Sequence, residues 1–217
     1  MPELTTQNPA GALAPAAPDY HPRTLKIASA DSLPFDLEAE KSVLSAIFLD
    51  PTNFTTVSSI LGSVASSEKK KKYAKEAAPA MGNPFFRRVA ATMFHEPMHA
   101  AIYEAMLNLS EGKLAIDVLS VSDWLSRAGR LEMIGGLEAL VEIQTYIVSA
   151  AHLESWCHLL RDYAMLREMM KTCSMSLELC KQGHENIKEL LDSVESEIFQ
   201  VRNKFVQSEI VELRALL

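Results

Sequence analysis

The sequence predicts an all-α fold in which a compact helical bundle is followed by a long antiparallel helical hairpin. Glycine is scarce, at 8 of 217 residues, which favours helices. Apolar residues recur at helical spacing through much of the chain after residue 34. From about residue 152 this spacing becomes a heptad repeat, which is typical of long helices that pack along a narrow seam.

Composition excludes several classes of protein. Apolar residues make up 48% of the chain and charged residues 23%, as in ordinary globular proteins, so the chain as a whole is not disordered. No apolar run reaches the roughly 18 residues that span a bilayer, and residues 1–17 lack the features of a secretory signal. Three cysteines cannot form a disulfide framework. We therefore expect a cytoplasmic protein with no membrane partner.

Two segments are not expected to pack. Residues 1–33 are rich in Ala, Pro, Thr and Ser and predict a disordered N-terminal tail. Residues 62–92 carry seven Lys and Arg against two Asp and Glu in a chain of net charge −7, and we interpret them as a mobile basic insertion. Alternatively, this insertion could contact nucleic acid. The lysines that would do so are Lys69, Lys70, Lys71, Lys72 and Lys75.

Residues 34–150 are predicted to form the globular bundle. Asp36 is placed to cap a first helix, which ends at Asp50 because the next residue is proline. A short helix follows over residues 53–61, and helical periodicity resumes at Pro97. Gly112 is suited to end that helix in a left-handed conformation.

Two further helices complete the predicted bundle. Asp117 is placed to cap the first, which ends at Gly129. The second opens at residues 135–136 and runs through Ile143. Short, closely spaced amphipathic helices of this kind indicate one shared core.

Residues 151–206 are predicted to form the hairpin. Apolar residues spaced alternately by three and four follow both helices, with a turn near residues 182–185. Cys173 and Cys180 lie in the first seam and are expected to pack in the core. Two helices alone bury too little, so an outer face should meet a second copy. The residues assigned to that oligomer interface are Trp156, Leu159, Tyr163, Leu166, Met170, Leu191, Val194, Ile198, Val201 and Phe205.

Residues 95–99 read His-Glu-Pro-Met-His, which fits the zinc-hydrolase pattern H-E-x-x-H. That chemistry needs both histidines on one helical face. Proline costs about 3 kcal/mol inside a helix but is favourable at its first position. Pro97 should therefore begin the helix, leaving His95 outside it. We expect no metal site and reject a metal hydrolase.

Nucleotide chemistry is also not indicated. The Gly112-Lys113 pair lacks both the first glycine and the Ser or Thr of a phosphate-binding loop. Glu38 and Glu40 lie two residues apart, so they should diverge on a helix and be solvated. We expect no catalytic residue and no cofactor in this chain, and its functional surfaces should bind other proteins.

Several of these segments resemble the N-terminal domain of the bacterial replicative DNA helicase DnaB. Residues 34–40 and 43–47 resemble its first-helix signature, in which Ser45 stands where the family has glycine. His95 replaces an aromatic residue, and residues 62–92 are longer than the family's connection. The other resembling segments are residues 93–103, 116–117, 129–131, 134–136, 149–151 and 160–167.

The resemblance implies a fragment of an ATP-dependent DNA helicase. Residues 207–217 resemble the start of the linker to a RecA-like ATPase domain, which is missing here. ATP and Mg are expected only in that motor domain. By resemblance, the N-terminal domains pair through their hairpins, and three pairs form a collar on a hexameric ring. The primase C-terminal domain and a helicase loader are the implied protein partners, and DNA would be bound by the full-length ring.

Two alternatives remain open from the sequence. A naturally short, helicase-like regulator would assemble with full-length rings or inhibit them, and the downstream coding sequence distinguishes this case. A single-stranded DNA-binding accessory protein would use the Lys-rich insertion. Its binding would fall steeply with salt and with Lys-to-Ala substitutions.

Overall fold

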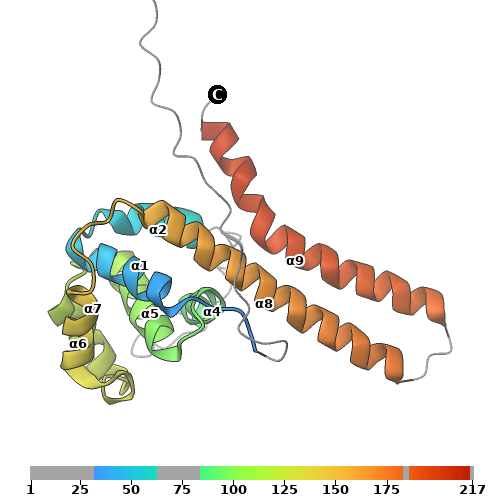
Figure 1. The fold of residues 1–217 in the computed structure, drawn as a ribbon, viewed down its shortest axis with the longest axis horizontal. Helices are drawn as coiled ribbons and strands as arrows, with labels where there is room; N and C mark the ends of the chain where they lie inside the picture. Colours follow the sequence, from blue (N-terminus) through green and yellow to red (C-terminus); the bar gives the residue numbers. More distant parts are fainter. Residues whose placement is uncertain (1–31, 63–83, 183–185, 216–217) are drawn as a thin grey trace, which may run out of the picture.

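The computed structural model describes residues 32–62, 84–182 and 186–215, and every regular element in these ranges is a helix. The predicted all-α fold is confirmed. Figure 1 shows a compact bundle from which the last two helices extend as an antiparallel hairpin. The elements are α1 (Leu37–Leu49), α2 (Asn53–Gly62), α4 (Pro84–Met93), α5 (Pro97–Glu111), α6 (Val118–Arg127), the 3-10 turn η2 (Glu132–Ile134), α7 (Gly136–Gln144), α8 (Leu153–Lys181) and α9 (Ile187–Ala215).

Helix α1 lies at the centre of the bundle. The Asp36 side chain accepts a hydrogen bond from the backbone N–H of Ala39 at 2.9 Å, so the predicted N-cap is confirmed. Val43, Leu44 and Ile47 are fully buried, because α2, α5, α7 and α8 all pack against α1. A helix covered on this many sides must be apolar around most of its circumference.

Helix α4 corrects the predicted extent of the basic insertion. Its apolar side chains follow the spacing i, i+3, i+4 and i+7 and are buried, and α4 packs on α5 and α8. The prediction treated these residues as one segment with the preceding lysine run, and the helical period is visible only when the two are separated. Residues 63–83, which include the five candidate lysines, lie outside the described residues. The buried residues of α4 are Phe86, Val89, Ala90 and Met93.

The predicted starts of the next helices are confirmed, and α5 ends next to Gly112 as predicted, but the expected left-handed conformation of Gly112 is wrong. Pro97 is the first residue of α5, and the side chain of Asp117 caps α6 by accepting from the N–H of Ser120 at 2.8 Å. At the end of α5 the left-handed residue is Lys113, with φ 55°, whereas Gly112 stays right-handed. Gly135, with φ 91°, leads into α7 in a conformation that other residues rarely adopt.

The hairpin consists of α8 and α9, which are 29 residues each. Asn186 begins α9, where its side-chain oxygen accepts from the N–H of Lys188 at 3.1 Å. Helix α9 continues through residues 207–215, which the resemblance assigned to the start of a linker. Figure 1 shows these last turns bending away from α8. Within the described residues, no helix is both long and apolar enough to cross a membrane.

Candidate functional site

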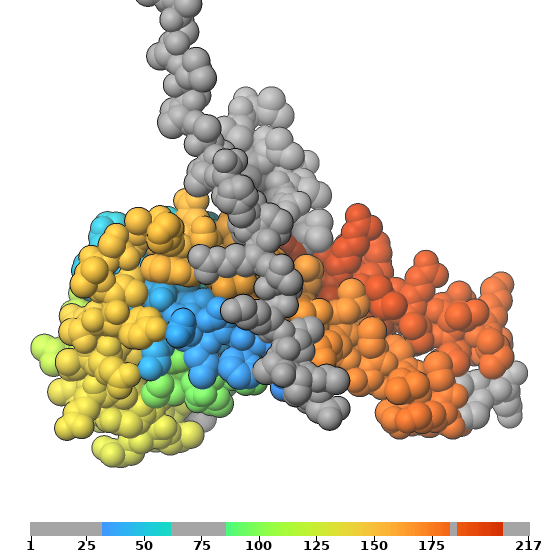
Figure 2. Space-filling view, viewed as in Figure 1, coloured from blue at the N-terminus to red at the C-terminus, as the bar shows by residue number. Residues whose placement is uncertain are grey.

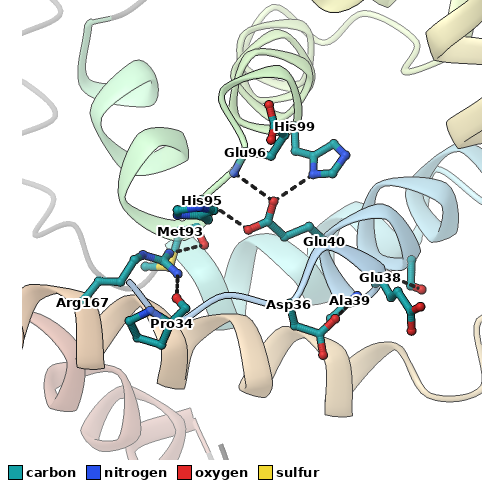
Figure 3. A network of polar contacts seen from close by, with 11 residues as sticks. Pro34, Asp36, Glu38, Ala39, Glu40, Met93, His95, Glu96, His99 and Arg167 are labelled. Atoms are coloured by element: carbon teal, nitrogen blue, oxygen red, sulfur yellow. Dashed lines mark hydrogen bonds and ion pairs between the residues drawn. The ribbon is translucent and has the colours of Figure 1, made fainter. Parts of the chain in front are cut away.

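A buried polar junction joins the bundle to the hairpin, and we define it by Glu40, His99 and Arg167 with their partners (Figure 3). The Glu40 carboxylate is 1% exposed. It accepts hydrogen bonds from the backbone N–H of His95 at 2.6 Å and of Glu96 at 3.2 Å. Its third partner is Nδ1 of His99, at 2.8 Å. The expectation that Glu40 is solvated is therefore wrong, whereas Glu38 is exposed.

The position of Glu40 follows from the start of α5. Glu96 precedes this helix but does not cap it with its own side chain. The first N–H groups of a helix have no partner within the helix, and its N-terminus carries a partial positive charge. Glu40 supplies the missing acceptor from α1, so one carboxylate fixes α1 against the start of α5.

Arg167 of α8 completes the junction from the hairpin side. Its guanidinium donates to the carbonyl oxygens of Pro34 at 2.9 Å, Thr92 at 3.0 Å and Met93 at 2.9 Å. Two of these oxygens end α4, where a positive charge is favourable. Burial lowers the pKa of Arg167, and the nearby carboxylate of Glu40 opposes that shift. The arginine thus binds the root of the hairpin to α4 and to the segment entering α1.

A second buried carboxylate is paired with a side chain of α4. Glu104 of α5, which is 1% exposed, accepts from Nε of Arg87 at 3.2 Å and from Nη1 of Arg130 at 2.6 Å. These ion pairs join α4 and α5 to Arg130, which lies in the segment that follows α6. Glu40 and Glu104 are thus both held by donors of the protein itself. Their arrangement fixes the geometry of the bundle, and the functional surface has to be sought outside it.

The H-E-x-x-H pattern has the geometry that Pro97 predicts. His95 precedes α5, and its ring stacks on Phe35 with centroids 4.3 Å apart. His99 lies inside α5 and binds Glu40, so the two imidazoles do not share a helical face. Over residues 32–62, 84–182 and 186–205, no cluster of three His, Cys, Asp or Glu side chains could hold a metal ion.

The residues assigned to the oligomer interface fall into three groups. Those nearest the bundle are covered by the chain's own core, because the root of the hairpin packs there, and they offer no surface to a second copy. They are Leu159, Tyr163, Val201 and Phe205. Trp156, Leu166, Met170 and Val194 are half-buried. Leu191 and Ile198, further along the hairpin, are 64% and 40% exposed.

The distal hairpin exposes further apolar side chains that the predicted interface left out. Leu177 on α8 is 57% exposed and Ile187 on α9 is 62% exposed. Ile187, Leu191 and Ile198 are spaced by four and seven residues, so they share one face of α9, which we call the α9 stripe. The same spacing in the sequence could have identified Ile187. Figure 2 shows the hairpin projecting beyond the bundle, where such surface is open to a partner.

The predicted burial of two cysteines is wrong. Cys173 and Cys180, expected in the core, are exposed in the single chain. Cys157 is buried at the root of α8, and burial, with a smaller effect of Glu154, raises the pKa of its thiol to about 12. A thiol with such a pKa is a poor nucleophile near neutral pH.

Known proteins share this sequence pattern and fold. Residues 83–162 match the family described as DnaB-like helicase N terminal domain. The replicative DNA helicases DnaC of Bacillus subtilis and DnaB of Geobacillus stearothermophilus are each 25% identical over 171 residues, which is 79% of this chain and 32% of theirs. The crystal structure of the N-terminal domain of DnaB helicase from Mycobacterium tuberculosis matches with a TM-score of 0.56 at 23% identity, covering 77% of this chain and 99% of that one.

These matches define the class of protein as a helical N-terminal domain of the replicative-helicase type. More particularly, residues 83–162 match the DnaB-like helicase N terminal domain, and the resemblance stated from the sequence is confirmed. The chain spans about a third of the length of the first two relatives.

The two single-residue departures from the family signature, Ser45 and His95, have partners in the fold. The Ser45 hydroxyl donates to the carbonyl oxygen of Gln144 at 3.2 Å and accepts from the N–H of Ile147, also at 3.2 Å. A serine is therefore tolerated in the core because its hydroxyl is paired with the end of α7. His95 keeps the flat ring of the aromatic residue it replaces and stacks on Phe35.

Proposed function

We propose that this chain is the N-terminal collar domain of a replicative DNA helicase. Copies would pair through their hairpins, and the C-terminal domain of primase and a helicase loader would dock on the resulting assembly. The observation that carries this proposal is the projecting hairpin, whose distal half exposes apolar side chains in a domain of the helicase family.

The energetics of the hairpin support self-pairing. Fully burying one large aliphatic side chain stabilises by about 1.5–3 kcal/mol relative to leaving it in water. The α9 stripe contains three such side chains, Ile187, Leu191 and Ile198, each at least 40% exposed. A two-fold axis buries the same patch on both copies, so one short stripe contributes twice. Three such pairs would give the hexameric collar.

The remaining activities belong to a longer protein in this proposal. The relatives named as replicative DNA helicases are about three times the length of the matched region. ATP and Mg would bind to a motor domain beyond this chain, and DNA would be held by the complete ring in the cytoplasm. This domain would contribute assembly and docking. The buried carboxylates Glu40 and Glu104 would stabilise the bundle that carries the docking surfaces.

Light scattering of the purified chain, alone and mixed with the C-terminal domain of primase from the same organism, tests the docking part. We expect an oligomer of the 24.0 kDa chain alone and a heavier complex after mixing. The remainder of the same primase, without its C-terminal domain, serves as the matched control and should add no mass. Oligomers that bind neither primase domain would contradict primase docking and leave a loader as the remaining partner.

A further inference from the structure

A basic groove of about 810 Å³ lies where α4, α8 and α9 meet. Arg88 lies on its α4 side, Lys171 on its α8 side and Lys204 on its α9 side. Leu33 and Met170 add apolar surface. We propose that this groove binds a short acidic peptide segment that carries apolar side chains, supplied by a partner protein. This inference does not depend on the proposed helicase function.

The charges of the groove stand out against those of the whole chain. Its lining contains four basic side chains and one acidic side chain, whereas the net charge of the chain is −7. Lys204 pairs with the acidic one, Glu168, at 3.0 Å, and Arg167 is engaged with three backbone carbonyls. Arg88 and Lys171 are exposed, and their charged groups have no partner among the described residues. Within the part of the chain that the structure describes, two cations on facing helices are therefore available to a ligand.

The junction holds these cations in place. Arg167 forms part of the groove lining and fixes the end of α4 to α8 through the carbonyls of Thr92 and Met93. Arg88 lies one turn before Thr92, whose hydroxyl donates to the Arg88 carbonyl at 2.9 Å. The contacts of Arg167 thus set the spacing between the backbones of α4 and α8 from which Arg88 and Lys171 project. Such preorganisation reduces the entropic cost of binding.

The lining favours a peptide over nucleic acid. Single-stranded nucleic acid is held by aromatic side chains on which bases stack, and none of the ten described residues that line the groove is aromatic. A polyanion would also be repelled by the net negative chain and by Glu168 in the groove. Carboxylates of a short peptide can pair with Arg88 and Lys171, while its apolar side chains contact Leu33 and Met170. A volume of this size suits a ligand of a few residues.

Fluorescence anisotropy of the whole chain with a rhodamine-labelled peptide of about eight residues, alternating Asp and Leu, tests this site. We expect saturable binding. The double variant Arg88→Glu/Lys171→Glu should weaken it at least about tenfold, because two attractions become repulsions. Glu168→Gln should strengthen it about threefold, because it removes the carboxylate of the groove and releases Lys204. A purely structural role of Glu168 would not give tighter binding.

The matched control is Arg127→Glu/Lys181→Glu, which reverses one arginine and one lysine outside the groove and should leave the affinity within about twofold. The same peptide with Lys in place of Asp should not bind. Failure of the acidic peptide to bind, or equal weakening by the control variant, would overturn the proposal. Tighter binding of a labelled oligothymidine, lost in Arg88→Glu/Lys171→Glu, would overturn it in favour of nucleic acid.

Discussion

Replacing Glu40 with glutamine is expected to lower the free energy of unfolding by about 3 kcal/mol. The carboxylate accepts from three donors in a site that excludes water. An amide of the same size has one acceptor oxygen and places an NH2 group against one of those donors. Removing the charge also weakens the attraction to the N-terminus of α5.

Thermal unfolding followed by circular dichroism measures this effect. For a chain of this size, 3 kcal/mol corresponds to a fall in Tm of about 6–12 °C. Glu38→Gln is the matched control, because Glu38 lies on the same helix but is exposed, and it should change Tm by less than about 2 °C. Equal shifts for the two variants would show that the buried junction does not stabilise the fold.

Replacing Arg167 with alanine is expected to cost about 2–4 kcal/mol. Three carbonyl oxygens lose their charged donor, and the end of α4 is no longer fixed to α8. Arg167→Lys should recover less than half of the loss, because one ammonium cannot reproduce the forked geometry of the guanidinium. The location of the damage is also predicted: α4 should open more readily than α6 or α7.

Amide hydrogen exchange measures this local opening. Residues 86–94 should exchange at least about tenfold faster in Arg167→Ala, while the α6 segment changes little. Lys171→Ala, one turn further along α8 on the exposed surface, should leave both segments unchanged. Uniformly faster exchange along the whole bundle would contradict a specific attachment of α4 by Arg167.

The local features of this fold could be predicted from local signals. Asp36 and Asp117 cap their helices because short acceptors precede apolar helical periods, and Pro97 begins α5 for the same local reason. The heptad spacing identified both hairpin helices. The residues of α4 also follow a helical period. Because the lysine run lies next to them, the whole segment resembled one exposed insertion.

The junction and the interface depended on information that the spacing does not contain. Glu40 and His99 are 59 residues apart, and Arg167 and Pro34 are 133 apart, so only the packed fold brings them together. The sequence places Glu40 two residues after Glu38, and this spacing alone predicts that both carboxylates are solvated. Likewise, Leu159 and Val201 fit a heptad seam, but the bundle already covers them. Periodicity predicts which face is apolar, whereas packing decides what covers it.

Light scattering of hairpin variants distinguishes pairing through the distal hairpin from any other mode of assembly. The unmodified chain should form an oligomer, with a mass that is two or more times the 24.0 kDa of one chain. Leu191→Asp, which places a charge in the α9 stripe, should reduce the mass to 24.0 kDa without loss of helical circular dichroism. Leu119→Asp, at a residue of α6 that is 74% exposed, should retain the oligomer. A monomeric unmodified chain, or an oligomer that survives Leu191→Asp, would contradict pairing through this surface.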